Sequence, residues 1–184
     1  MIVTKLKKVA ATLITSIIIL LVVALFTTKK YDVVRSIVIN KPKAEVFNYI
    51  KYLENQNNFI IWKDLTSDTT WVRKGKDGEV GYTSFWKNNT GVKTEGEKEI
   101  TRIDQGERFD FELRFLYPFD LVISSYMTTE SLGANKTKVT WTTNKELPYP
   151  KNIILVFYDY GARLGNDVLK GLNNLKVILE DTDK

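Results

Sequence analysis

The fold of this chain is decided by residues 150–180, which read PKNIILVFYDYGARLGNDVLKGLNNLKVILE. One set of positions recurs there at steps of three and four residues, the period of one helical face. Its members are Phe157, Gly161, Leu164, Val168, Leu172, Leu175 and Leu179. Charged and amide side chains occupy the opposite face. The spacing predicts one helix of roughly 30 residues, on the order of 45 Å long, whose apolar stripe requires a broad apolar surface to pack against.

Strand signals fill the chain between residue 31 and residue 144. Runs rich in β-branched and aromatic residues alternate with turns that contain Gly, Asn or Asp. The predicted strands are residues 31–40, 69–73, 79–87, 92–104, 108–115, 121–131 and 136–144, with short helices after Pro42. We therefore expect an α+β fold, in which a curved antiparallel sheet of about six to seven strands wraps around the long C-terminal helix.

The composition excludes several kinds of chemistry. The 184 residues include no cysteine and no histidine, so the chain has no disulfide, no thiolate nucleophile and no Ser-His-Asp triad. We expect neither a metal site nor a cofactor, and any catalysis by side chains would rest on carboxylates, Lys or Tyr. The net charge of +5 is no argument for a nucleic-acid partner, because part of it flanks an apolar segment and no binding motif accompanies it.

That apolar segment, VAATLITSIIILLVVALF, covers residues 9–26, and its 18 residues reach the lower end of a membrane span. A cleaved signal peptide is one alternative, with residues 22–24 before the cut, although the apolar run continues beyond them. A buried core helix is another, although the segment is apolar all round. We expect an uncleaved anchor, which divides the chain into a membrane segment, residues 1–30, and a globular domain, residues 31–184.

Lysines flank the apolar run on both sides. Lys5, Lys7 and Lys8 precede it, and Lys29 and Lys30 follow it. Positive charge concentrates on the cytoplasmic side of membrane spans, so the small excess before the run places the N-terminus in the cytoplasm. We expect a single-pass protein of the cell membrane whose globular domain lies outside.

Several short motifs resemble those of one superfamily. Residues 35–42, RSIVINKP, followed by Glu45-Val46-Phe47, resemble the opening of the START-like, Bet v 1-like (SRPBCC) superfamily. The bacterial polyketide cyclase/dehydrase and lipid-transport branch is the most similar. Further similarities lie at residues 80–81, Trp86, Gly96, Ile100 and residues 117–119, 137–141 and 171–176. The resemblance covers roughly residues 31–180. It implies a helix-grip fold with a deep apolar cavity between sheet and C-terminal helix, and a hydrophobic small molecule as ligand.

The resemblance also suggests which residues line that cavity. The predicted ligand-binding residues are Trp62, Trp86, Phe111, Tyr126, Trp141, Phe157, Tyr160 and Gly161. Ordinary core packing is the alternative for each aromatic residue. Gly161 allows either close packing or open space above the helix, at a propensity cost of up to ~1 kcal/mol. Glu95, Glu97 and Glu99 alternate along one strand, which favours a solvated outer face over an acid/base site.

Three functions are compatible with these observations. The first is a membrane-anchored, non-enzymatic binder or carrier of a hydrophobic small molecule such as a lipid or polyketide. The second is a cyclase/dehydrase-type enzyme acting on such a molecule, and the third is a ligand-free interaction module. The lack of His and Cys favours binding over catalysis, and the superfamily branch shares no catalytic motif that would reverse this preference.

Overall fold

The computed structural model describes residues 2–61, 69–90, 93–118 and 120–181, which fall into two compact units. The first unit consists of Met1–Tyr31 and Glu146–Tyr160. The second consists of Asp32–Lys145 and Gly161–Lys184. The first unit thus combines the N-terminal apolar segment with the residues just before the C-terminal helix, an association that the sequence does not indicate.

The N-terminal unit is built on helix α1, Ile2–Phe26. Its portion Val3–Phe26 is long and apolar enough to cross a membrane, and it is the one such helix among the described residues. The side chains of residues 3–26 are exposed except that of Ala24. The rest of the unit contains a 3₁₀ turn, η1 (Lys151–Ile153), and one turn of helix, α4 (Ile154–Phe157).

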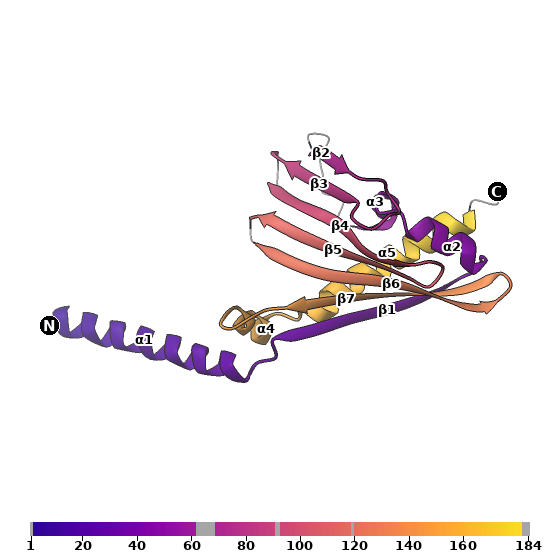
Figure 1. Ribbon diagram of the computed structural model, residues 1–184. Helices are drawn as coiled ribbons and strands as arrows, with labels where there is room; N and C mark the ends of the chain where they lie inside the picture. The colour runs from indigo at the N-terminus through magenta and orange to yellow at the C-terminus, as the bar shows by residue number, and fades with distance from the viewer. Residues whose placement is uncertain (1, 62–68, 91–92, 119, 182–184) are drawn as a thin grey trace. The chain divides into compact units, whose positions relative to one another are not determined.

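The second unit contains a seven-stranded antiparallel sheet with the strand order β1-β7-β6-β5-β4-β3-β2 (Figure 1). The strands are β1 (Lys30–Ile39), β2 (Thr69–Lys74), β3 (Thr83–Asn88), β4 (Thr94–Asp104), β5 (Arg108–Tyr117), β6 (Leu121–Gly133) and β7 (Lys136–Glu146). From β2 to β7, each strand pairs with the next one along the chain. The predicted number of strands and their antiparallel arrangement are confirmed.

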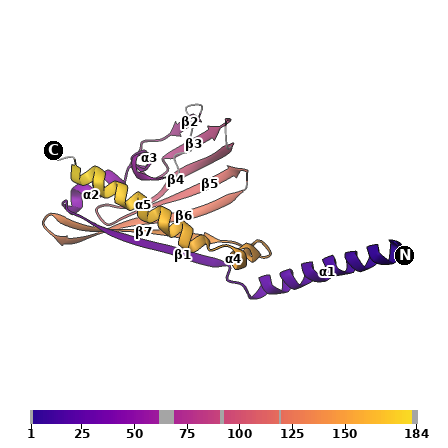
Figure 2. The same ribbon diagram turned by 180° about the vertical axis from the view of Figure 1, so that it is seen from behind.

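Helix α5, Tyr160–Glu180, crosses one face of the curved sheet, and α2 (Lys43–Ile50) and α3 (Gln56–Phe59) lie on the same side (Figure 2). The predicted apolar stripe is the face that packs on the sheet, since Val168, Leu172, Leu175 and Leu179 are buried. The predicted α+β helix-grip fold, with its long C-terminal helix and N-terminal apolar helix, is therefore confirmed.

The prediction of one continuous helix over residues 150–180 is wrong, because residues 151–157 form only the short turns η1 and α4 and the helix is interrupted before α5 begins at Tyr160. The backbone of Tyr158 is extended, with φ −141° and ψ 117°, and separates α4 from α5. Residues 153–157 read IILVF and are apolar on every side, so a periodic pattern cannot show where the helix is interrupted. Gly161 is half-buried, whereas Gly165 and Gly171 are the fully buried glycines of α5.

Strand alternation gives the sheet a distinct inner face toward α5. Phe109, Phe111, Leu113 and Phe115 of β5 share this face, and their register partners extend it across β4 and β6. At one end of the strands the inner face is closed, because Phe109 and its partner Met127 are fully buried. Toward the other end, Leu113 and Phe115 become half-exposed.

Candidate functional site

A buried lysine, Lys98, lies on this inner face in the middle of β4. It alternates with Gly96 and Ile100, both buried, and its register partners are Ser84 of β3 and Leu113 of β5. Its Nζ donates a hydrogen bond to Oδ1 of Asn57 at 3.3 Å. Burial lowers the pKa of the Lys98 ammonium from 10.5 to about 8, although the negative charge of Glu54 acts in the opposite direction. A substantial fraction of neutral amine is therefore present near pH 8.

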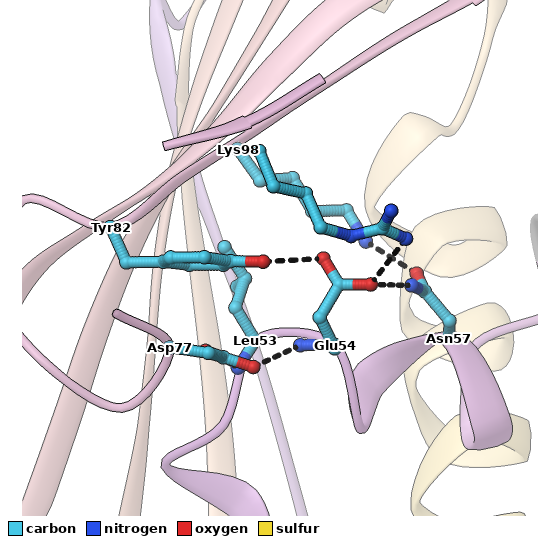
Figure 3. Close-up of polar contacts among 7 residues, drawn as sticks. Leu53, Glu54, Asn57, Asp77, Tyr82 and Lys98 are labelled. Carbon is cyan, nitrogen blue, oxygen red and sulfur yellow. Dashed lines mark hydrogen bonds and ion pairs between the residues drawn. The ribbon is translucent and has the colours of Figure 1, made fainter. Parts of the chain in front are cut away.

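Glu54, between α2 and α3, supplies negative charge beside Lys98 (Figure 3). The polar cluster consists of Glu54, Asn57, Arg73, Tyr82 and Lys98. Its carboxylate accepts hydrogen bonds from the Tyr82 hydroxyl at 2.9 Å, from Nη2 of Arg73 at 2.9 Å and from Nδ2 of Asn57 at 3.3 Å. Burial works against ionisation of Glu54, but the hydrogen bonds, led by that of Arg73, outweigh it and hold its pKa below the usual value. Burial, reinforced by Glu54, raises the pKa of the Tyr82 phenol.

Asp77 fixes the backbone that carries Glu54. Its carboxylate accepts hydrogen bonds from the backbone N–H groups of Leu53 at 2.7 Å and Glu54 at 3.0 Å, and from Gly78 at 2.8 Å. The turn before β3 is thereby joined to the turn after α2. This contact holds Glu54 where it can reach Tyr82 and Asn57, so the geometry of the cluster is set by backbone contacts as well as by side chains (Figure 3).

Three of the predicted ligand-binding aromatic residues meet on the inner face. Trp86, Phe111 and Trp141 are each at most 5% exposed. The rings of Phe111 and Trp141 make an edge contact with centroids 6.1 Å apart, and Trp86 makes an edge contact with Phe115 at 5.5 Å. Such pairs are favourable beyond their buried area. The structure therefore gives these aromatics well-packed neighbours, and their ligand-binding role stays a prediction.

The open end of the inner face adjoins this aromatic group. Leu113 and Phe115 of β5 face Ile123 and Leu121 of β6 in register, and all four apolar side chains remain half-exposed. Lys98 is the register partner of Leu113 on the other side. The inner face thus offers partly exposed apolar surface next to a buried amine.

The remaining predicted ligand-binding residues lie elsewhere. Tyr126 is on the outer face of the sheet, where the guanidinium of Arg108 lies 3.8 Å from its ring centroid, because its strand neighbours Ser125 and Met127 point inward. Phe157 is 73% exposed and belongs to α4, not to α5. Trp62 and the side chain of Tyr160 lie outside the described residues, and Gly161 is half-buried at the start of α5.

A surface pocket of about 260 Å³ lies at the β3–β4 hairpin and is lined mainly by polar side chains such as Lys87, Asn88 and Glu95. This polar pocket is not the predicted apolar cavity, which stays a prediction. Within the described ranges, no three His, Cys, Asp or Glu side chains gather as a metal site would require.

Sequence analysis missed Lys98, Glu54, Tyr82 and Asp77. For Lys98 the signal was present, because Glu95, Glu97 and Glu99 were placed on the outer face, and strict alternation then turns Lys98 inward. The outer position of those glutamates is supported by Arg114, whose guanidinium contacts Glu97 at 3.0 Å and Glu99 at 2.6 Å. Glu54 and Asp77 meet only through the fold, so no local pattern marks them.

No protein-family model matches the chain, and no curated protein matches its sequence. Solved structures do match. Norcoclaurine synthase from Thalictrum flavum superposes with a TM-score of 0.61 at 9% identity, over 86% of this chain and 98% of that chain. Ara h 8.0201 gives a TM-score of 0.55 at 10% identity, over 83% of this chain and 99% of that chain. A protein from Nitrosospira multiformis gives a TM-score of 0.57 at 15% identity, over 80% of this chain and 94% of that chain.

Identities this low establish the fold alone. The neighbours share the curved antiparallel sheet and the long C-terminal helix, the two features that define the second unit here. The chain therefore has the helix-grip fold that these solved structures share.

Proposed function

We propose that this protein is a membrane-anchored binding protein for a hydrophobic small molecule, held between the inner face of the sheet and α5. The observation that carries the proposal is the open end of that face, where Leu113, Phe115, Leu121 and Ile123 stay half-exposed although they point inward. Mostly apolar concave surfaces with a few polar groups are typical small-molecule sites. A ligand covering them would gain ~25 cal/mol per Å² of apolar area removed from water.

The polar cluster predicts a second property of this ligand, a polar acceptor group. Lys98 is a buried cationic donor and the register partner of Leu113, and Glu54 engages Tyr82 and Arg73, so the apolar surface has a donor group on the neighbouring strand. A buried ammonium whose hydrogen bond goes to an amide oxygen is only partly compensated, and a carboxylate or carbonyl oxygen on the ligand would offset the remaining cost. The ligand class that fits is an amphipathic molecule with an apolar body and one acceptor group, such as a fatty acid or a polyketide-like acid.

The fold neighbours support a small-molecule site. Norcoclaurine synthase from Thalictrum flavum was solved in complex with dopamine and hydroxybenzaldehyde, and that structure superposes on 85% of this chain with a TM-score of 0.58. The helix-grip scaffold therefore accommodates small aromatic molecules in at least that protein. For this chain, the size and chemistry of the ligand follow from its own inner-face residues.

Helix α1 supplies the membrane part of the proposal. Its exposed apolar surface from Val3 to Phe26 fits a bilayer span, and from the lysine distribution we infer that the globular domain lies outside the cell membrane. Because the chain has no cysteine, an Asn135→Cys variant carries a single reactive thiol on the domain. A membrane-impermeant maleimide added to intact cells, with any outer membrane permeabilised, should label it, and labelling only after lysis would reverse the orientation.

A second candidate function is catalysis on the same ligand. The specific observation in its favour is the Lys98 amine, whose lowered pKa of about 8 suits proton abstraction near neutral pH. Tyr82 keeps its proton and donates to Glu54, so the cluster holds a base and a hydrogen-bond donor within one group of contacts. Turnover of a bound carbonyl compound that disappears in Lys98→Met, with binding retained, would establish this function over simple binding.

The binding proposal is tested by comparing a fluorescent fatty acid with the alcohol of the same chain length, both added to the full chain in mild detergent. The wild type should bind the acid several-fold more tightly than the alcohol. Lys98→Met should abolish this preference while retaining the affinity for the alcohol. Lys138→Met, which removes a half-exposed lysine of β7, should behave as the wild type. Equal affinities for both probes in the wild type would contradict the acceptor-group assignment.

A further inference from the structure

An exposed apolar patch lies beside the end of α1 within the first unit. Ile154 is 42% exposed, Val156 50% and Phe157 73%. Two tyrosines flank them, Tyr149 and Tyr158, and both are also exposed. We refer to these five residues as the interfacial patch. A patch of this kind on a segment of ten residues is unusual for a surface in water.

Asn152 joins the patch to the C-terminal end of α1. Its Nδ2 donates hydrogen bonds to the backbone carbonyls of Ala24 at 2.7 Å and Thr27 at 3.0 Å. These carbonyls belong to the last turn of α1 and the residue following it, where carbonyls lack partners within the helix. Asn152 is fully buried, and Ala24 is the one buried side chain of residues 3–26. These hydrogen bonds therefore fix the position of the patch along the axis of α1.

Two further contacts hold this part of the first unit together. The backbone N–H of Leu147 donates to the carbonyl of Lys29 at 2.7 Å, and Lys30 pairs with Glu146 at 3.4 Å. The chain that leaves α1 and the chain that leads into η1 are thus joined side by side. As a result, the patch lies where α1 ends, at the residues that would emerge from a bilayer.

The chemistry of the patch matches the boundary layer of a bilayer. Tyrosine side chains are enriched at headgroup level because one end of the ring is apolar and the other is polar. Lys29 and Lys151 are exposed beside the patch and are suited to lipid phosphates. Aliphatic and aromatic side chains next to such lysines are typical of segments that lie in the plane of the interface.

We propose that the interfacial patch, on α4 and the residues beside it, is a second membrane contact that lies in the headgroup layer where α1 leaves the bilayer. This inference rests on the proposed anchoring role of α1. The occupant is lipid, because Asn152 holds the patch at the end of a helix whose apolar side chains are themselves exposed. The contact restrains the position of residues 149–158 against the membrane surface.

The experiment uses the full chain in proteoliposomes and exploits the absence of cysteine. Single variants Phe157→Cys, Leu13→Cys and Asn135→Cys are labelled with an environment-sensitive fluorophore. Leu13 lies in the middle of α1 and reports on the anchor, whereas the exposed Asn135 lies in the β6–β7 turn and reports on solvent. Phosphatidylcholine brominated either near the headgroup or near the chain end then serves as the quencher.

The Phe157 label should be quenched more strongly by shallow than by deep bromines, and the Leu13 label should show the reverse. The Asn135 label should be insensitive to both lipids. A Phe157 label that behaves like the Asn135 label, while the Leu13 label is quenched, would overturn the second contact and leave the anchor intact. A blue-shifted but unquenched Phe157 label would indicate burial against protein and would also overturn it. No quenching at Leu13 would refute the anchor itself.

The role of Asn152 is tested in the same system. In an Asn152→Ala background, the shallow quenching of the Phe157 label should decrease several-fold because the two hydrogen bonds to α1 are lost. The Leu13 label should keep its quenching, which shows that the helix still spans the bilayer. Unchanged quenching at Phe157 would contradict the role given to Asn152.

Discussion

The Nζ atom of Lys98 donates to Oδ1 of Asn57 at 3.3 Å, in a position where the lysine side chain is almost wholly removed from water. One amide oxygen and the more distant charge of Glu54 do not restore the hydration that an ammonium loses. The pKa of Lys98 is consequently lowered to about 8 from 10.5. Such a group couples protonation to folding.

This coupling predicts how stability depends on pH. As pH falls from 10.5 to 8, the unfolded chain takes up a proton at Lys98 before the folded chain does, so the folded state loses stability. The penalty is complete below pH 8 and disappears as pH rises through 10.5. For a shift of this size it is on the order of 3 kcal/mol.

Chemical unfolding of the full chain in mild detergent measures the effect. Between pH 8 and 10, the free energy of unfolding of the wild type should rise relative to that of Lys98→Met. Above pH 10 the raised pKa of Tyr82 acts in the opposite direction in both proteins, so the comparison is confined to that window. Parallel pH profiles for the two proteins would show that Lys98 is not desolvated.

Asp77 predicts a second effect on stability. Asp77→Ala removes the acceptor for the N–H groups of Leu53 and Glu54 and should lower the free energy of unfolding by about 1–3 kcal/mol. Glu79→Ala is a matched control in the same turn, because Glu79 pairs with Lys76 at the exposed surface and should cost less than about 1 kcal/mol. Equal losses in the two variants would mean that the Asp77 contacts do not position the turn.

Trp86 and Gly96 predict a third effect, since the indole ring lies over the glycine. A Cβ on Gly96 would fall 2.5 Å from two ring atoms of Trp86 and 2.5 Å from the carbonyl oxygen of Arg114. Gly96→Ala should therefore destabilise the domain by about 1–3 kcal/mol. In a double-mutant cycle, Trp86→Leu should relieve part of that loss, and strict additivity would rule out the contact as its cause.

The anchor is tested by extraction of membranes. The full chain should remain with the membrane fraction in high salt and in alkaline carbonate, because an apolar helix of this length is stabilised by the hydrocarbon core and not by charge. Immunodetection of the chain in the membrane and the soluble fractions measures this distribution. Recovery of intact, full-length protein in the soluble fraction would contradict an anchoring role for α1.

Local periodicity predicts much of the fold. Val168, Leu172, Leu175 and Leu179 lie on the buried face that their spacing predicts, and Phe109 and Phe111 lie on the buried face of β5. Periodicity failed where the sequence has none, at residues 153–157, and there the interruption before α5 was missed. The break also accompanies the contacts of Asn152 with the end of α1 and with Thr27, which join residues 128 and 125 positions apart.

The site was less predictable than the fold. Tyr126 was expected in the cavity as an aromatic residue, yet alternation with Ser125 and Met127 turns it outward, where Arg108 covers its ring. Lys98 follows the same rule in the opposite direction. Glu54 and Asp77 come from separate turns and gain their roles only through contacts that the folded chain creates, which no single segment encodes.

Added bulk on the inner face of the sheet should displace a hydrophobic ligand that is held there. Ile123 is half-exposed on that face and its neighbour Val122 is exposed on the outer face of the same strand. Ile123→Trp therefore fills the proposed site, and Val122→Trp adds the same bulk outside it. Both variants, like the wild type, are purified as full chains in detergent.

Native mass spectrometry of these three proteins tests whether the inner face is a ligand site. The wild type and Val122→Trp should carry an adduct of discrete mass that solvent extraction releases as an amphipathic molecule, and Ile123→Trp should lose most of it. An unoccupied wild type that takes up no added fatty acid, or equal occupancy in both tryptophan variants, would contradict a ligand site on the inner face.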